Sequence, residues 1–160
     1  MELQHHLTIP DNLSLIFNPI TTLFASFILG LLSSYLIQIF KPTQENNYLN
    51  FINDKTKKKI GVLFVGNLIK TTPLKYFNTR VYLNQKKLKN NVTVLKIELK
   101  LAKNLHLLGF YYYLLILTFL VFIKIDLLSF IIHMSLNILF NLYVALHLQY
   151  QINRLEKLYQ

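Results

Sequence analysis

Two long apolar blocks that carry almost no charge are the feature that most restricts how this chain can fold. The first block covers residues 13–40 and has no charged side chain, and the second covers residues 105–148, where only "KID" at 124–126 interrupts it. A helix of about 20 apolar residues spans the ~30 Å hydrocarbon core of a bilayer. We therefore expect an integral membrane protein rather than a soluble domain.

The second block is long enough for two spans, which we place at 107–123 and 127–146. Because only three residues separate these spans, they should form a tight helical hairpin. With the first span, 13–40, they predict an all-α membrane protein with three transmembrane helices, in one membrane domain over residues 1–160. Polar side chains at membrane depth usually face protein or a water-filled cavity. The polar positions of the third span include His133, Asn137 and Asn141.

Composition excludes several kinds of chemistry. The chain has no cysteine, which rules out disulfides, thiolate metal sites and a cysteine nucleophile. His5 and His6 are adjacent, but the sequence places no further ligand beside them, so we expect neither a metal site nor a cofactor. Only four glycines and four prolines punctuate the chain, which favours long helices. Asn18-Pro19 marks the expected start of the first span, because proline fixes φ and has no backbone N–H to donate a hydrogen bond.

The net charge of +10 is concentrated between the apolar blocks. Residues 41–104 hold 14 of the 17 lysines and arginines and only three acidic residues. Under the positive-inside rule this basic segment lies in the cytoplasm, so the N-terminus is expected outside and the C-terminus in the cytoplasm. Arg154 and Lys157 near the C-terminus agree with this orientation.

The basic segment itself has three parts. The stretch "KIGVLFVGNLI" (59–69) is apolar but too short to span, so it should lie in the membrane interface or pack against the base of the bundle. Residues 72–84 contain Pro73 and have the mixed character of a loop. Residues 90–110 are typical of a helix, with Asn91 as a plausible N-cap, and this helix should continue without a break into the second span.

The lysine cluster "KTKKK" (55–59) has two compatible interpretations. Lys55, Lys57, Lys58 and Lys59 could bind anionic lipid head groups, which is worth about 1 kcal/mol for each basic side chain near the surface. Alternatively, the cluster is only a topology signal in a solvated loop. We expect no nucleic-acid partner, because the chain has no recognisable nucleic-acid module and its charge lies where topology already requires it.

His106 lies where a polar segment becomes apolar, in "LAKNLHLLGFYYYL" (101–114). A neutral imidazole can act as a general base toward a hydroxyl; from composition alone, an interfacial polar residue is the commoner explanation of a lone histidine. Glu98 is eight residues earlier, about 12 Å along a helix, so the two side chains could line one groove without bonding directly. Lys103 is one turn from His106, and its charge favours a neutral imidazole. The adjacent tyrosines 111–113 are typical of an aromatic membrane belt.

Two stretches suggest a family. "AKNLHLLGF" (102–110) resembles the "A-E-x-x-H-L-I-G-F" stretch of small bacterial membrane proteins similar to the carotenoid-glycoside acyltransferases of staphyloxanthin-type pathways. "NILFNLYVALHLQYQINRL" (137–155) is similar to their closing helix, with five residues on matching positions: Asn141, Tyr143, Gln149, Tyr150 and Arg154. Weaker similarity extends through residues 61–78 and the first span.

The resemblance implies an acyltransferase that moves a fatty acyl group to a sugar hydroxyl of a membrane-dissolved lipid or isoprenoid glycoside. It also implies that the protein lies in a bacterial inner membrane. His106 would be the base, Glu98 lies where related sequences often have an acidic residue, and the five matching positions with Lys103 would bind substrate. Lys103 stands where the family has glutamate, and Val144 stands where it has proline. These departures leave an alternative open, a non-catalytic accessory subunit of a larger membrane protein complex.

Overall fold

The computed structural model describes residues 18–40, 49, 52–73, 75, 92–122 and 125–159, and for residues 37–40 only the backbone. Its helices within these ranges are α2 (Pro19–Phe40), α3 (Asp54–Lys59), α4 (Val62–Thr71), α7 (Val92–Phe122), α8 (Leu127–Asn137), the π-helical turn η2 (Ile138–Leu142) and α9 (Tyr143–Leu158). Three units are long and apolar enough to cross a membrane, namely α2, α7 and the run α8–η2–α9. This confirms the expected fold class.

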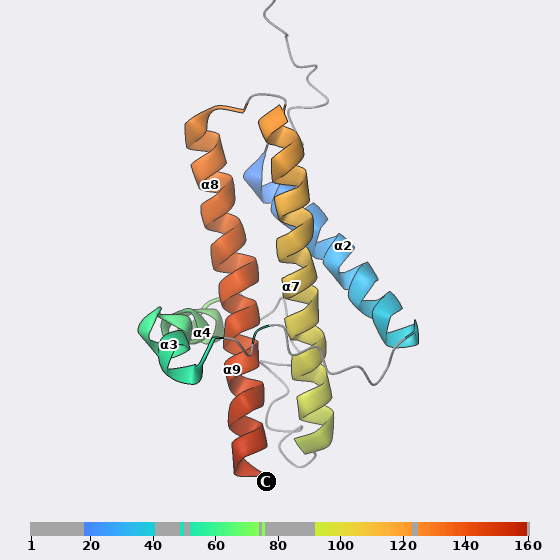
Figure 1. Ribbon diagram of the computed structural model, residues 1–160, viewed down its shortest axis with the longest axis vertical. Helices are drawn as coiled ribbons and strands as arrows, with labels where there is room; N and C mark the ends of the chain where they lie inside the picture. Colours follow the sequence, from blue (N-terminus) through green and yellow to red (C-terminus); the bar gives the residue numbers. More distant parts are fainter. Residues whose placement is uncertain are drawn as a thin grey trace, which may run out of the picture.

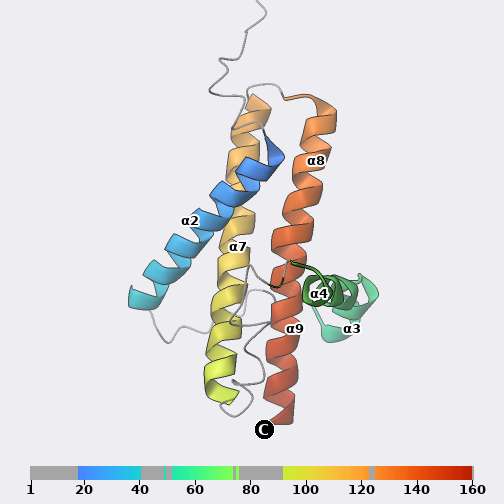
Figure 2. The ribbon, with the colours of Figure 1, turned by 180° about the vertical axis from the view of Figure 1, so that it is seen from behind.

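The long helices form a bundle with an antiparallel pair at its centre. Figures 1 and 2 show α7 and α8–η2–α9 standing side by side, with α2 crossing α7 obliquely. The short helices α3 and α4 lie beside α9, in the half of the bundle that holds the C-terminus, and α4 is seen nearly end-on in Figure 2. We call this half the base of the bundle.

The first span begins where the sequence predicts. The Asn18 side chain accepts a hydrogen bond from the Ile20 backbone N–H at 2.9 Å and thereby caps α2. The hydroxyls of Thr21 and Thr22 donate to the Asn18 carbonyl at 2.8 and 3.1 Å, so they satisfy themselves within the helix. Residues 13–17 of the predicted span lie outside the described residues.

The second span is part of one unbroken helix, as predicted. α7 has 31 residues and a length of about 46 Å, so it exceeds the ~30 Å core of a bilayer. Its last charged residue is Lys103, and the charge-free part, 104–122, is the part that matches the membrane. The proposed cap Asn91 and most of the loop expected at 72–84 lie outside the described residues.

The helix of the third span continues beyond the predicted 127–146, and α9 ends at Leu158. Asp126 caps the start of α8, where its carboxylate accepts hydrogen bonds from the backbone N–H of Ser129 at 2.9 Å and from the Ser129 hydroxyl at 2.5 Å. Asp126 belongs to the short link between the two spans, and the hairpin expected there is confirmed by the packing of α7 against α9.

Small residues let α2 approach α7 closely. Thr22, Ser26, Gly30 and Ser34 recur every four residues on α2 and are all buried. A Cβ built on Gly30 would lie 2.6 Å from the Leu105 carbonyl oxygen and 2.9 Å from the Gly109 backbone nitrogen. Small residues at such spacing are the usual contact of membrane helices, because they allow backbones to pack where lipid gives no hydrophobic driving force.

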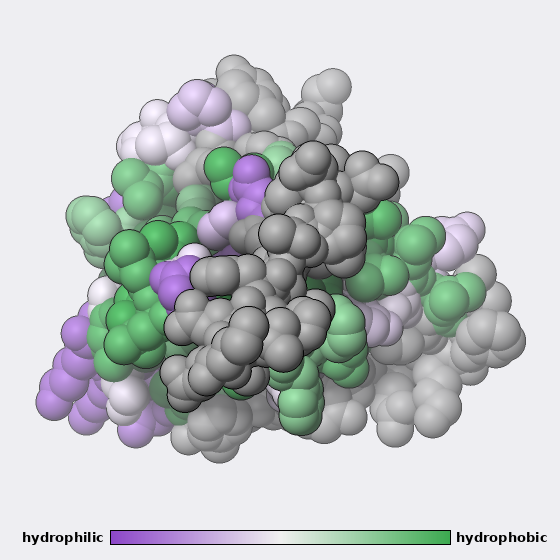
Figure 3. Space-filling view, turned by 90° about the horizontal axis from the view of Figure 1, so that it is seen from above, coloured by the Kyte–Doolittle hydropathy of each residue, from purple (hydrophilic) through white to green (hydrophobic). Residues whose placement is uncertain are grey.

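Large apolar side chains cover the outside of the spans. Phe122, Leu127, Leu115 and Leu128 are 81%, 74%, 69% and 68% exposed, and α2 presents a row of exposed apolar residues: Ile20, Phe24, Ile28, Leu31, Leu32 and Leu36. In Figure 3, most of the coloured surface is hydrophobic, and the strongly hydrophilic residues gather mainly at the lower left. Apolar side chains outside and polar ones inside are what a lipid environment favours.

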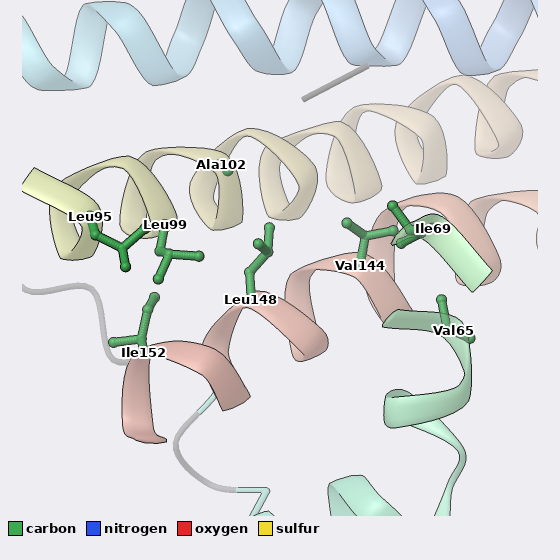
Figure 4. Close-up of a cluster of buried hydrophobic side chains, with 8 residues drawn as sticks. All are labelled: Val65, Ile69, Leu95, Leu99, Ala102, Val144, Leu148 and Ile152. Carbon is green, nitrogen blue, oxygen red and sulfur yellow. The ribbon is translucent and has the colours of Figure 1, made fainter. Parts of the chain in front are cut away.

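An apolar core holds the base of the bundle together. Figure 4 shows Leu148 and Ile152 of α9 directed toward α7, while Val144 lies beside α4. The complete cluster is Val65, Ile69, Leu95, Leu99, Ala102, Val144, Leu148 and Ile152. Of the two placements expected for residues 59–69, packing against the base of the bundle is therefore confirmed.

The lysine cluster is not a loop. Residues 54–59 form helix α3, whose cap is the Asn53 side chain accepting from the Thr56 backbone N–H at 2.8 Å. Lys55, Lys58 and Lys59 are exposed, whereas Lys57 is fully buried and lies 3.7 Å from the Asp54 carboxylate. The expectation of a solvated loop was wrong, because an N-cap and an acidic first residue allow even this lysine-rich stretch to form a helical turn.

Gly66 is the position where α4 packs against α9, and we predict that Gly66→Ala destabilises this contact. A Cβ on Gly66 would overlap the ring of His147, which is only 2% exposed and cannot move into solvent. Overpacking of this kind costs about 1–3 kcal/mol. The measurement is thermal unfolding in detergent micelles.

His147→Ala provides the control for this prediction, because it removes the ring that the new methyl group would strike. The double variant should lose less stability than the sum of the two single variants. Strictly additive losses would contradict the packing of Gly66 on His147.

Candidate functional site

A row of polar side chains lies buried between α7 and the run α8–η2–α9, where most membrane helices would have apolar residues. We call it the polar seam, and its members are Lys103, His106, Tyr113, His133, Asn137, Asn141 and Gln149. Six of the seven are between 0% and 3% exposed, and His106 is partly buried. Since polar groups inside a membrane protein are costly unless paired, the seam is the first place to look for function.

Tyr113 and His133 form the end of the seam farthest from the base. The Tyr113 hydroxyl lies 2.9 Å from His133 Nδ1 and donates to the Pro19 carbonyl at 3.3 Å. A phenol has one proton, so both bonds form together when His133 carries its proton on Nδ1 and donates to the phenol oxygen. Tyr113 is fully buried, so the prediction that it belongs to an aromatic membrane belt was wrong. Tyr111, in contrast, is 57% exposed.

Asn137 and Asn141 occupy the middle of the seam at the π-helical turn η2. Asn141 donates to the Asn137 side-chain oxygen at 2.9 Å, and Asn137 donates to the Phe110 carbonyl of α7 at 3.2 Å. Asn141 fits here because residue 109 is a glycine: a Cβ on Gly109 would lie only 3.1 Å from the Asn141 side-chain oxygen. Short π-helical turns inside α-helices are frequent at functional sites, because the extra residue redirects side chains.

His106 faces this asparagine pair from α7. The Asn141 side chain and the Phe140 backbone are within hydrogen-bonding reach of its ring. The ring also packs edge-on against Phe27 of α2, with centroids 5.7 Å apart. Its Nδ1 atom is buried and has no hydrogen-bond partner in the part of the chain that the structure describes. A held imidazole with one unengaged nitrogen can accept a proton from a hydroxyl placed beside it.

Lys103 begins a chain of hydrogen bonds that leads from the seam to the base. Its ammonium donates to the Gln149 side-chain oxygen at 3.0 Å, and the Gln149 amide donates to Asn153 at 2.7 Å. The Asn153 amide then donates to the Asp54 carboxylate at 3.0 Å, which joins α9 to α3. A buried ammonium can only donate hydrogen bonds, so it needs acceptors such as the Gln149 oxygen around it. Lys103 therefore has a structural role that its sequence position alone does not reveal.

Asp54 is the acceptor at the end of this chain. Its carboxylate also accepts a hydrogen bond from Lys157 at 2.8 Å, and Lys57 is 3.7 Å away. The bond from Lys157, helped by those from Asn153 and the charge of Lys57, holds the pKa of Asp54 below its usual 3.8, although partial burial opposes this. Burial lowers the pKa of the Lys57 ammonium, while Asp54 opposes that shift.

The lowered pKa of Asp54 predicts that acid releases α3 from α9. A carboxylate whose folded pKa is depressed stabilises the fold fully above its unfolded pKa, near 3.8, and loses this contribution as pH falls through the lower folded value. Hydrogen exchange of the α3 amides, corrected for intrinsic rates, should therefore show normal protection at pH 5 and a loss below pH 4.

Asp54→Asn should produce the same loss at neutral pH, with protection of α3 falling roughly tenfold. Lys55→Gln is the control, because it changes a charge on the same helix but at an exposed position. An Asp54→Asn variant with unchanged α3 protection would contradict the role given to this carboxylate.

The structure brings together some of the predicted site residues and separates others. Lys103 bonds Gln149, and His106 lies beside Asn141, so these four share the seam. The remaining predicted residues lie elsewhere. Glu98 is a partly buried residue in the first turns of α7, and Tyr143 packs against the apolar clusters at the base. The Tyr150 ring lies 5.9 Å from the Lys58 ammonium, and Arg154 is exposed on α9.

Several functional candidates were not assigned from the sequence. Asp54 and Asn153 had no sequence signal, because they are 99 residues apart and meet only through the packing of α3 on α9. His133 and Asn137 did have one, since they lie four residues apart, and Asn137 lies four residues before the predicted site residue Asn141, which places all three on one face of a helix. That pattern indicated an inward face but not its partners.

Comparisons of the chain with protein-family models, with curated proteins and with solved structures found no match. The class of protein defined by the fold is an all-α integral membrane protein with three candidate spans.

Proposed function

We propose that this chain is an acyltransferase-like membrane protein that acylates a hydroxyl of a membrane-dissolved lipid or isoprenoid glycoside. The observation that carries the proposal is His106 of α7, which packs against α2 and the π-helical turn and whose buried Nδ1 has no hydrogen-bond partner among the described residues. The resemblance of residues 102–110 and 137–155 to the carotenoid-glycoside acyltransferases supports the same chemistry.

In this proposal His106 is the general base. Nδ1 takes the proton of the acceptor hydroxyl, and the hydroxyl oxygen attacks the carbonyl carbon of an acyl thioester or ester. The tetrahedral intermediate then expels the thiol or alcohol of the donor, which leaves with the proton held by His106. The new ester bond replaces the old one, so no oxidant or reductant is needed. Asn141 and the Phe140 backbone would orient the imidazole.

The depth of His106 suits an amphiphilic acceptor. It is the third residue of the charge-free part of α7, 104–122, and so lies near one boundary of the part that matches the membrane. An acceptor with its sugar at the interface and its chain in lipid would present a hydroxyl at this level. Glu98 and Lys103 lie on the base side of His106, where a polar head group would enter.

The proposal includes an orientation, with the base in the cytoplasm of a bacterial cell and the N-terminus outside. This orientation is supported by the basic residues at the base, which are the lysines of α3, Lys70 of α4, and Arg154 and Lys157 at the end of α9. The exposed Lys55, Lys58 and Lys59 would then meet anionic head groups, while Lys57 is buried and does not take part. Since the chain has no cysteine, single cysteines placed at position 55 or 126 test the orientation by labelling with a membrane-impermeant reagent.

Reconstituted vesicles test the activity. The purified chain would be supplied with radiolabelled long-chain acyl thioester or with labelled phospholipid as donor, and with a monoglycosylated long-chain alcohol as acceptor. Protein-dependent transfer of label to the acceptor, sensitive to mild alkali as an ester must be, is the expected result. No transfer from either class of donor to glycosylated acceptors would contradict the proposal.

A second candidate, a non-catalytic accessory subunit, is favoured by one observation. Lys103 stands where the related family has glutamate, and here it is 3% exposed and bonded to Gln149. A residue tied into packing in this way cannot act as an acid or as a carboxylate that orients a base. Purification in mild detergent separates the candidates, because a subunit should co-purify with stoichiometric protein partners and an enzyme as a small monodisperse species with bound lipid.

A further inference from the structure

A cavity at the base of the bundle is separate from the polar seam. Its volume is about 470 Å³, within the range of about 300–1,000 Å³ that small-molecule sites occupy. It lies among the ends of α4, α7 and α9, and Lys103, His106 and Asn141 are not among the residues that line it. Whatever the cavity holds is thus distinct from the group that meets His106.

The lining of the cavity divides into a cationic part and an apolar part. Lys70, in the last turn of α4, and Arg154 of α9 supply the charge, and both are exposed. Leucines of α7 and α9 supply the apolar wall: Leu95, Leu99, Leu155 and Leu158. No acidic side chain is among its lining residues in the described part of the chain. Glu156 of α9, which is not one of the lining residues, forms an ion pair with Lys96 at 2.6 Å.

The level of the cavity matches the head groups of a bilayer. Its lining residues on α7 lie between Val92 and Leu99, and those at the end of α9 begin at Gln151, whereas the charge-free part of α7 begins only at residue 104. At 1.5 Å per residue, residue 99 lies about 8 Å beyond that point. This is where phosphate groups of phospholipids lie, while the acyl chains extend toward the spans.

We infer that this cavity binds one anionic phospholipid, with its phosphate between Lys70 and Arg154 and part of one acyl chain along the four leucines. Charge complementarity selects the anionic head group, because a zwitterionic lipid brings a cation that these two side chains would repel. The leucine wall selects a lipid over a free phosphate ion, since only the lipid removes apolar surface from water.

Native mass spectrometry of the full chain in a nonionic detergent tests the inference. The added probes are palmitoyl-oleoyl phosphatidylglycerol, phosphatidylcholine with the same chains, and inorganic phosphate. One phosphatidylglycerol should bind per chain, and both other probes should bind at least tenfold more weakly. Equal binding of phosphatidylcholine would overturn the choice of an anionic head group, and equal binding of inorganic phosphate would overturn the choice of a lipid.

Variants locate the binding. Lys70→Ala combined with Arg154→Ala should weaken phosphatidylglycerol binding about 30-fold, since each basic side chain near a membrane surface contributes a factor of about five. Both positions are exposed, so helix content by circular dichroism should be unchanged. The control is Lys55→Ala together with Lys59→Ala, which removes two exposed charges from α3 and should leave binding within twofold.

Two further results bear on the site. Leu158→Ser, at a position that is 66% exposed, should weaken phosphatidylglycerol binding without unfolding the chain, because it makes the apolar wall polar. An equal loss of binding in the α3 control and in the Lys70 and Arg154 variant would overturn the inference, because it would show that any basic charge at the base suffices.

Discussion

Replacing His106 by alanine is expected to lower the rate of acyl transfer by roughly 10²–10⁴-fold, the usual contribution of a general base. Without the imidazole no group of the seam is left that can take the hydroxyl proton, since Asn141 and Asn137 are amides and Tyr113 and His133 are engaged with each other. The measurement is the initial rate of label transfer in vesicles at saturating donor. His106→Gln should be as inactive as His106→Ala, because an amide cannot be protonated at neutral pH.

His133→Gln is the matched control for His106→Ala. It removes another histidine from the same hairpin. His133 is buried and its Nδ1 bonds the Tyr113 hydroxyl, so it is not available as a base. We expect it to lower thermal stability while folded protein keeps a rate within a few-fold of the wild type. If His106→Ala protein transferred acyl groups at the wild-type rate, His106 would not be the base, and the accessory-subunit candidate would become the stronger one.

Replacing Gly30 by valine is expected to have the largest effect on the fold, because the groups that it would strike belong to backbone. A Cβ at this position comes within 2.6 Å of the Leu105 carbonyl oxygen and 2.9 Å of the Gly109 nitrogen, and neither can rotate away. Overpacking costs about 1–3 kcal/mol, occasionally more, and here the strain falls on the contact that holds α2 to α7. Thermal unfolding in detergent micelles should show the loss, with Gly30→Ala intermediate.

Ala25→Val is the matched control for Gly30→Val. Ala25 is exposed on α2, so the added methyl groups point away from α7 and stability should hardly change. Separation of α2 should also break the hydrogen bond between the Ser33 and Tyr112 hydroxyls, which are 2.6 Å apart. Equal stability of Gly30→Val and Ala25→Val would show that α2 does not cross α7 at this glycine.

The spans could be predicted from the sequence because their cause is local. Lipid cannot satisfy backbone groups, so an apolar run of sufficient length must be helical wherever it lies in the chain. The start of α2 at Pro19 follows in the same way from the capping of adjacent residues. Even the inward direction of His133, Asn137 and Asn141 follows from the cost of a polar group in lipid, and all three are buried.

The errors concern residues whose surroundings come from other helices. Tyr113 was assigned to the membrane surface because tyrosines gather there, but its partners are His133 on α8 and the Pro19 carbonyl on α2. Both interpretations of the lysine cluster, head-group binding and a solvated loop, place Lys57 at the surface, but the packing of α3 beside α9 buries it next to Asp54. Composition describes the average position of a residue type and not which helix it will face.

The sequence by itself determined that this chain is a three-span helical membrane protein, that its basic residues gather at one end, and that His106 lies where a hydrophilic segment enters the apolar spans. Only the tertiary structure decided that His106 meets Asn141, that Lys103 is bonded to Gln149, and that Lys70 and Arg154 share a cavity. The physical reason is the register of α7 against α8–η2–α9, where Gly109 meets Asn141 at the π-helical turn, together with the packing of α4 against α9. Helix formation is a property of neighbours in the chain, whereas register is a property of surfaces that meet only after the helices have formed.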